Sequence, residues 1–140
     1  MPQRVADLPE CGPDDLDVSA AWDLIDGALR GQIVVQNIGN RTCRLSGKPT
    51  LIPLGLDGQP VPARFIISLE LRVPPVVLPL GARAAAALGW SGWCGNPASG
   101  DARISCGSET KIVSVSGPRQ PECPENGGPT NLSSSWFNLQ

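Results

Sequence analysis

Hydrophobic and polar residues alternate with a period of two along much of the chain. In segment 16–24 the even positions are apolar, and Asp, Ser or Ala occupies the odd ones. Segments 29–36 and 65–72 have a similar alternation. Because successive side chains of a strand point to opposite faces of a sheet, this pattern is typical of strands with one buried face. We therefore predict a strand in each of these three segments.

Shorter apolar segments separated by turn-forming residues account for most of the remaining chain. Residues 37–40 (Asn-Ile-Gly-Asn) and Asp57-Gly58 are typical of turns, because Asn, Asp and Gly tolerate a positive φ. The further strands predicted between such turns are 42–45, 51–56, 76–78, 102–106, 111–115 and 132–137.

The alanine-rich segment 84–88 admits two interpretations. Its composition has the highest helix propensity in the chain, but only seven residues separate Gly81 from Gly89, too few for a stable isolated helix. Alternate residues as far as Trp90 share one face, which favours a strand. About eight short strands then predict an all-β fold, an immunoglobulin-like antiparallel β-sandwich with Greek-key connections. A closed barrel is the alternative.

The composition limits the chain to one domain with many turns. The 140 residues include 16 Gly and 15 Pro, and 41% are hydrophobic against 17% charged, which excludes a disordered chain. We expect residues 1–10 to be a flexible N-terminal leader and residues 11–140 to form a single disulfide-bonded domain. The longest apolar stretch, 73–80, contains three prolines and is far shorter than the roughly 18 to 20 residues that cross a bilayer. No transmembrane segment is predicted.

Charge is distributed unevenly, although the formal net charge is only −2. Residues 1–27 hold seven carboxylates and one Arg, whereas residues 28–119 hold ten basic and four acidic residues. The acidic residues either lie against a basic body or occupy ordinary solvated positions, and the second interpretation is simpler. They are Asp14, Asp15, Asp17, Asp23 and Asp26. No run of Lys and Arg is interleaved with aromatic residues, so no nucleic-acid surface is predicted.

The side chains and motifs that most often carry catalysis are missing from the sequence. The chain contains no His, the usual general base near neutral pH. It has neither a G-x-S-x-G nucleophile elbow nor a Gly-rich phosphate loop followed by Lys. The cysteines form no C-x-x-C pair, and the Asp14–Asp17 cluster lacks the spacing of an EF-hand calcium loop. The sequence therefore predicts no catalytic residue, metal site or cofactor.

Five cysteines spread over the whole chain indicate an oxidised framework, which forms outside the cytosol. Cys106 shares a predicted strand face with an isoleucine, and it is therefore the residue best suited to remain a buried thiol. Cys43 and Cys123 lie in polar or Pro-rich surroundings typical of strand ends. The two disulfides that we favour are Cys11–Cys43 and Cys94–Cys123. A rival arrangement pairs Cys94 with Cys106 and leaves Cys123 as the thiol.

The aromatic residues are four Trp and two Phe, with no Tyr. Trp22 and Trp90 fall on the predicted core faces of strands. Trp93 and Trp136 are the candidate ligand-binding residues, since an exposed indole can stack on a glycan or a protein partner. The structural alternative for both is to pack against a disulfide or to cap the sandwich.

Five motifs follow one another in the order found in a known family. They are N-x-G-x-x-x-C-x-L-x-G-x-P at 37–49, the D-G turn at 57–58, L-x-x-G-x-x-A at 78–84, W-x-x-x-C at 90–94 and a late cysteine at 123. Together they resemble the domain of unknown function 4232 family of actinobacterial exported proteins and lipoproteins. The resemblance implies an immunoglobulin-like sandwich, export to the cell envelope and the two favoured disulfides, and it supplies no reaction. Cys106 departs from the family pattern.

These features predict an exported, non-catalytic binding or structural module of the bacterial cell envelope, whose signal sequence has been removed from this chain. The expected partner is an unknown protein or a cell-wall glycan. One alternative is a carbohydrate-binding domain that uses Trp93 and Trp136. A second is an adhesive or structural dimer linked through Cys106, although a monomer is favoured.

Overall fold

The computed structural model describes residues 7–12, 14–66, 74–106 and 109–140, and these residues are all-β. They form eleven strands, four of which have only two or three residues. The strands are β1 (Leu16–Ile25), β2 (Ala28–Asn37), β3 (Cys43–Leu45), β4 (Thr50–Gly55), β5 (Arg64–Phe65), β6 (Val76–Leu78), β7 (Arg83–Ser91), β8 (Ala98–Cys106), β9 (Glu109–Ser114), β10 (Asn131–Ser134) and β11 (Asn138–Leu139).

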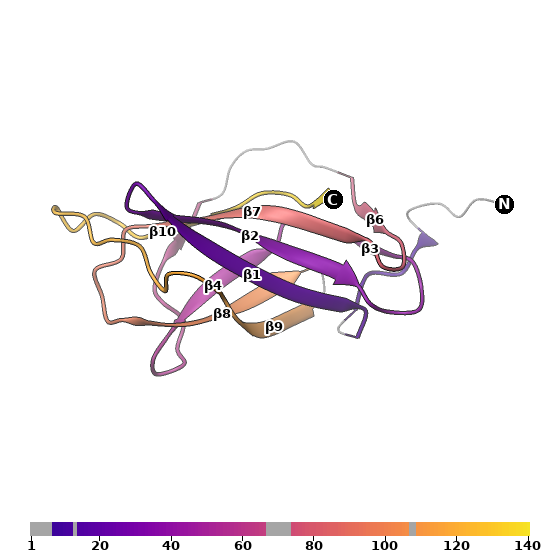
Figure 1. Ribbon diagram of the computed structural model, residues 1–140, viewed down its shortest axis with the longest axis horizontal. Helices are drawn as coiled ribbons and strands as arrows, with labels where there is room; N and C mark the ends of the chain where they lie inside the picture. Colours follow the sequence, from indigo (N-terminus) through magenta and orange to yellow (C-terminus); the bar gives the residue numbers. More distant parts are fainter. Residues whose placement is uncertain (1–6, 13, 67–73, 107–108) are drawn as a thin grey trace.

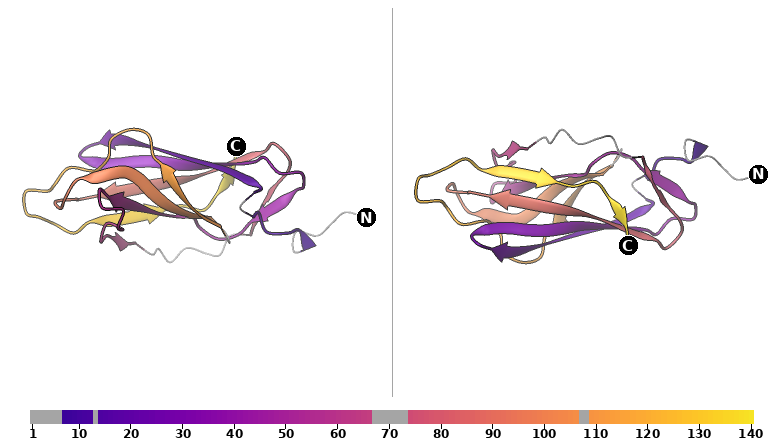
Figure 2. Two further views of the ribbon diagram at one scale, coloured as in Figure 1. Left: turned by 90° about the horizontal axis from the view of Figure 1, so that it is seen from below. Right: turned by 90° about the horizontal axis from the view of Figure 1, so that it is seen from above.

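Two larger sheets face each other as a β-sandwich (Figure 1). One has the order β1-β2-β7-β10-β5, with β11 also paired to β7, and the other has the order β4-β8-β9. A small β3-β6 sheet lies at the end of the molecule where the described chain begins (Figure 2). The paired strands are antiparallel, except β10 and β5, which are parallel. The predicted all-β sandwich is confirmed, and the immunoglobulin-like connectivity stays a prediction.

The core forms between the two larger sheets, where both contribute fully buried side chains. Leu29 and Ile33 of β2 and Trp90 of β7 meet Leu51 of β4 and Ile104 of β8, and none of these five is more than 2% exposed. Each comes from a strand in which buried and exposed positions alternate. Because removing apolar surface from water drives folding, this alternation selects the face that each strand turns inward.

Strand β7 settles the ambiguity of the alanine-rich segment in favour of a strand. Ala84 and Ala86 are buried, and they pair with Val35 and Ile33 of β2. Small side chains on β7 leave room between the sheets for the larger residues of β2. Tertiary packing therefore overrides the helix propensity of this run.

Several predicted boundaries differ from the structure. Residues 67–72 of the predicted strand 65–72 lie outside the described part of the chain. The predicted strand 132–137 matches β10 only as far as Ser134, and the buried Phe137 precedes the short strand β11. Exposure of Leu24 reaches 47%, so the buried face of β1 ends at Trp22.

The folded domain also begins before Cys11, which corrects the predicted leader. Leu8 is buried, and the carbonyl oxygen of Pro9 accepts a hydrogen bond from the N–H of Arg44 at 2.9 Å. Glu10 forms a parallel bridge with Arg44. Residues 8–10 thus belong to the domain, and residues 1–6 of the predicted leader lie outside the described residues.

The outer edge of β1 is covered by the chain that follows β9. The N–H of Trp22 donates to the carbonyl oxygen of Ser116 at 2.8 Å. The N–H of Ser116 donates in turn to the carbonyl oxygen of Ala20 at 3.2 Å. Lys111 of β9 also donates through Nζ to the carbonyl oxygen of Leu16 at 2.9 Å. These contacts join the two sheets along one side of the sandwich and satisfy part of an otherwise open edge.

Candidate functional site

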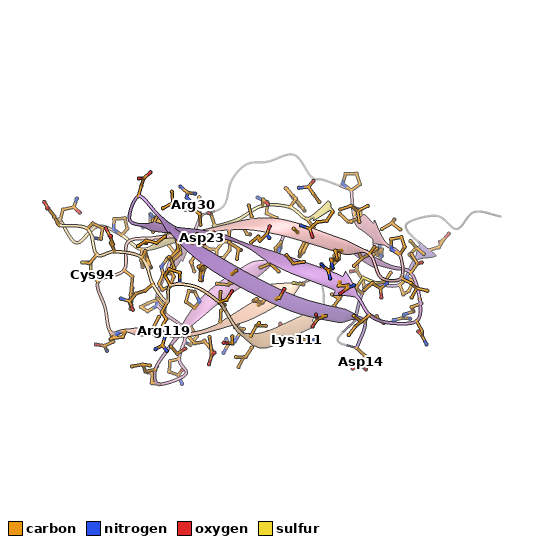
Figure 3. The ribbon with its side chains drawn as sticks, viewed as in Figure 1. Asp14, Asp23, Arg30, Cys94, Lys111 and Arg119 are labelled. Carbon is orange, nitrogen blue, oxygen red and sulfur yellow. A yellow bond between two sulfur atoms is a disulfide. The ribbon has the colours of Figure 1, made fainter. Side chains whose placement is uncertain are left out.

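Three loops gather at one end of the sandwich, opposite the β3-β6 sheet (Figure 1). They are the β4–β5 loop (56–63), the β7–β8 loop (92–97) and the long segment between β9 and β10 (115–130). The Cys94–Cys123 disulfide joins the last two, and Figure 3 shows Cys94 at this end of the molecule. Loops fixed on a rigid sandwich in this way are frequent recognition surfaces.

A groove of about 690 Å³ opens between the β4–β5 and β7–β8 loops. This volume lies within the range of small-ligand sites. We call it the Trp93 groove. It is lined by Gly55, Leu56, Asp57, Gln59, Pro60, Val61, Pro62, Trp93, Gly95, Asn96 and Pro97.

Trp93 is held in a fixed orientation at one wall of this groove. Its indole Nε1–H donates to the carbonyl oxygen of Asn96 at 2.8 Å. Its ring lies 6.4 Å from that of the buried Trp90, between ring centroids, at an interplanar angle of 44°. Gly95 passes so close to the indole that an added Cβ would overlap the ring. These contacts restrict the Trp93 rotamer before any ligand arrives.

The opposite wall is a tight turn that carries two polar side chains. Oδ1 of Asp57 accepts a hydrogen bond from the N–H of Gln59 at 3.0 Å. The N–H of Gly55 donates to the carbonyl oxygen of Gln59 at 2.9 Å, and Gly58 has a φ of 78°, which glycine adopts without strain. The predicted Asp57-Gly58 turn is therefore present, and it positions Asp57 and Gln59 along the groove.

The structure does not bring Trp93 and Trp136 together. Trp136 is half-buried, lies outside the Trp93 groove, and has Lys48 Nζ 5.5 Å from its ring centroid, a cation–π contact. Asp57, Gln59 and Asn96 line the groove with Trp93, and none of them was predicted to be a ligand-binding residue. The turn signal at Asp57-Gly58 marked one of them as a loop residue, but nothing in the sequence places that loop beside residue 93.

The cysteines form two disulfides in contrasting surroundings. Cys11 and Cys43 are buried, with Cα atoms 5.0 Å apart, whereas Cys94 and Cys123 are exposed, with Cα atoms 4.7 Å apart. Cys106 lies outside both disulfides and is 2% exposed. These are the pairs favoured from the sequence, and the rival Cys94–Cys106 pair is not formed. The burial of Cys106 argues against a dimer linked through it.

A second polar cluster, beside Cys43 at the other end of the sandwich, has a structural role. The Asn37 side chain is 1% exposed, donates to the carbonyl oxygens of Arg41 at 2.8 Å and Leu78 at 2.9 Å, and accepts from the N–H of Gly39 at 2.9 Å. It thus joins the end of β2 to β6 and to the following turn. The N-x-G motif is explained by these hydrogen bonds.

Asp15 is the acidic residue of the N-terminal segment that is buried against a basic partner. Its carboxylate accepts from the N–H of Gly12 at 2.8 Å and lies 3.3 Å from a guanidinium nitrogen of Arg41. The Gly12 hydrogen bond and Arg41 together hold the pKa of Asp15 below its ordinary value, despite the opposing effect of burial. Of the five aspartates named in the sequence analysis, the other four, including Asp14 and Asp23 in Figure 3, are exposed. Within the described residues, no group of three acidic or cysteine side chains is arranged to hold a metal ion.

The fold and the site define a disulfide-bonded, all-β sandwich domain with a loop-built groove at one end. The family model of a domain of unknown function, DUF4232, matches residues 11–133 of the chain. The chain belongs to this family. Neither a curated protein nor a solved structure matches it.

Proposed function

We propose that this domain is an exported, non-catalytic binding module of the bacterial cell envelope, and that the Trp93 groove is its ligand site. The observation that carries the proposal is the immobilised Trp93 indole facing a rigid polar turn across a groove of about 690 Å³. Fixed aromatic side chains in pockets contribute strongly to binding because little conformational entropy is lost on association.

The disulfides support the extracytoplasmic location in this proposal. Two intrachain disulfides are expected where the compartment is oxidising. In the part of the chain that the structure describes, no helix is long and apolar enough to span a membrane.

The lining of the groove supports binding rather than acid–base catalysis. Among the described residues that line it, Asp57 alone is titratable, and Oδ1 of that carboxylate already accepts a hydrogen bond within the turn. Acid–base catalysis commonly needs a second group with a complementary protonation state.

Fragment screening by NMR tests the proposal. A library of short sugars, peptides and aromatic amides is titrated into the 15N-labelled protein, and the Trp93 indole resonance is followed. We expect saturable shifts at residues of the groove, weakened at least tenfold by Trp93→Leu and unchanged by the matched Trp136→Leu.

Because Trp93 packs beside Trp90, folding of each variant is checked by thermal unfolding, and Trp93→Phe is used where Leu disturbs it. Binding that maps to another surface, or no binding by any fragment, overturns the proposed site.

A further inference from the structure

We infer that the ligand of the Trp93 groove is a neutral oligosaccharide. This inference rests on the proposed function and names the class of ligand. It follows from three properties of the groove: its apolar surfaces, its polar groups and its charge.

The apolar surfaces are rigid and suit the C–H faces of sugar rings. Pro60, Pro62 and Pro97 line the groove with Trp93, and none of these side chains has the rotamer freedom of a long aliphatic residue. Leu56, 69% exposed, extends the same surface toward solvent. A pyranose can therefore bury apolar area here at a small cost in side-chain entropy.

The polar groups of the groove suit a ligand whose own polar groups each donate and accept hydrogen bonds, as hydroxyl groups do. Asp57 supplies a carboxylate whose orientation is fixed by the hydrogen bond that its Oδ1 accepts from the N–H of Gln59. Gln59 and Asn96 each carry an amide with both donor and acceptor atoms. Planar carboxylate and amide groups can each contact two neighbouring hydroxyls.

The charge of the groove disfavours anionic ligands. Among the described residues, its lining includes one carboxylate and no Lys or Arg. A phosphate or uronate would meet repulsion from Asp57 without a compensating cation. Neutral sugars carry no such penalty.

A proline-rich peptide is the competing occupant, and the geometry favours it less. Grooves that bind such peptides are lined by several aromatic residues. Here Trp93 is the one aromatic residue in the lining, and its Nε1–H is already donated to the carbonyl oxygen of Asn96. The indole therefore cannot donate to a peptide carbonyl without breaking that hydrogen bond.

Titration of the 15N-labelled protein with defined probes tests the inference. The neutral probes are maltotriose, cellotriose and tri-N-acetylchitotriose, and the comparison probes are trigalacturonate and a ten-residue proline peptide. We expect saturable shifts of the Trp93 indole and Asn96 side-chain resonances with at least one neutral trisaccharide.

The Asp57→Asn variant isolates the role of the carboxylate. The variant keeps an oxygen at the Oδ1 position, which can still accept the hydrogen bond from the N–H of Gln59 and so preserve the turn. We expect it to weaken trisaccharide binding at least tenfold. Asp101→Asn, an exposed aspartate on β8, is the matched control and should leave binding unchanged.

Failure of all three neutral trisaccharides to shift the groove resonances overturns the inference, as does tighter binding of trigalacturonate or of the peptide. If the peptide or trigalacturonate binds in the groove, the ligand class is wrong but the proposed site stands. If neither these probes nor the fragment library binds there, the proposed function fails as well.

Discussion

Asp15 and Asn37 are polar side chains buried where a hydrophobic residue would ordinarily be expected. Each forms a hydrogen bond with the backbone: the Asp15 carboxylate accepts from the N–H of Gly12, and the Asn37 amide donates to the carbonyl oxygen of Leu78. A buried backbone group without a partner costs about 1 to 3 kcal/mol. These two residues therefore hold the loops around the Cys11–Cys43 disulfide more firmly than apolar contacts alone would.

Asp15 makes part of this stability depend on pH. Its pKa is lower in the folded protein than in the unfolded chain, so its contribution is complete above the unfolded value near pH 4 and is lost as the pH falls through the folded value. We expect Asp15→Asn to lower the free energy of unfolding at pH 7, with a difference from the wild type that shrinks toward pH 2.

Urea unfolding at pH 7, 4 and 2.5 measures this difference. The exposed Asp14→Asn serves as the control and should follow the wild type at each pH. A loss of stability in Asp15→Asn that is the same at all three pH values would contradict the lowered pKa assigned to Asp15.

At the scale of the elements, β1 is closely approached by backbone on both of its edges. β2 pairs with it over its whole length on one edge, and Ser116 pairs with it on the other. A Cβ at Gly31 would overlap the carbonyl oxygen of Ala21, and one at Gly117 would overlap that of Trp22. Close approach of the backbones, rather than turn geometry, is thus the reason for glycine at position 31.

We expect Gly31→Ala to destabilise the domain by about 1 to 3 kcal/mol, the usual cost of overpacking. Gly128→Ala, in the loop before β10, is the control, because its added Cβ would meet only the end of the Asn126 side chain. Chemical denaturation of both variants measures the effect. Equal stability of the two would show that β1 and β2 can separate without cost.

The strands also show how much of the fold could be predicted from the sequence. The alternation in 16–24 predicted β1 because burial in that strand follows the period of two, and the faces of β2 and β7 were found in the same way. The pairing of Ser116 with β1 had no such signal, because its hydrogen bonds use only the backbone. The Trp93 groove could not be predicted for a related reason, since the loops that form it are about 35 residues apart in sequence.

At the scale of the whole molecule, the two disulfides close loops of similar length but differ in accessibility. Their sequence separations are 32 and 29, so the chain-entropy estimate gives each about 3 to 4 kcal/mol. Their rates of reduction should nevertheless differ, because thiol exchange requires access to a sulfur atom.

We expect mild dithiothreitol to reduce Cys94–Cys123 in the folded protein while Cys11–Cys43 persists until the domain unfolds. Alkylation followed by peptide mass spectrometry identifies the reduced cysteines at each time point. A Cys94→Ala/Cys123→Ala double variant, which should show no early alkylation, is the control. Simultaneous loss of both disulfides would contradict the difference in exposure.

The described chain begins at the end of the sandwich where the β3-β6 sheet lies, and the β4–β5 and β7–β8 loops, whose residues line the Trp93 groove, lie at the other end (Figure 1). Strand β7, with nine residues, runs between these ends and spans about 30 Å at the rise of an extended strand. If the protein is tethered through residues before Asp7, the rigid sandwich becomes a spacer that presents the groove away from the point of attachment. The site would then face outward without any movement of the domain.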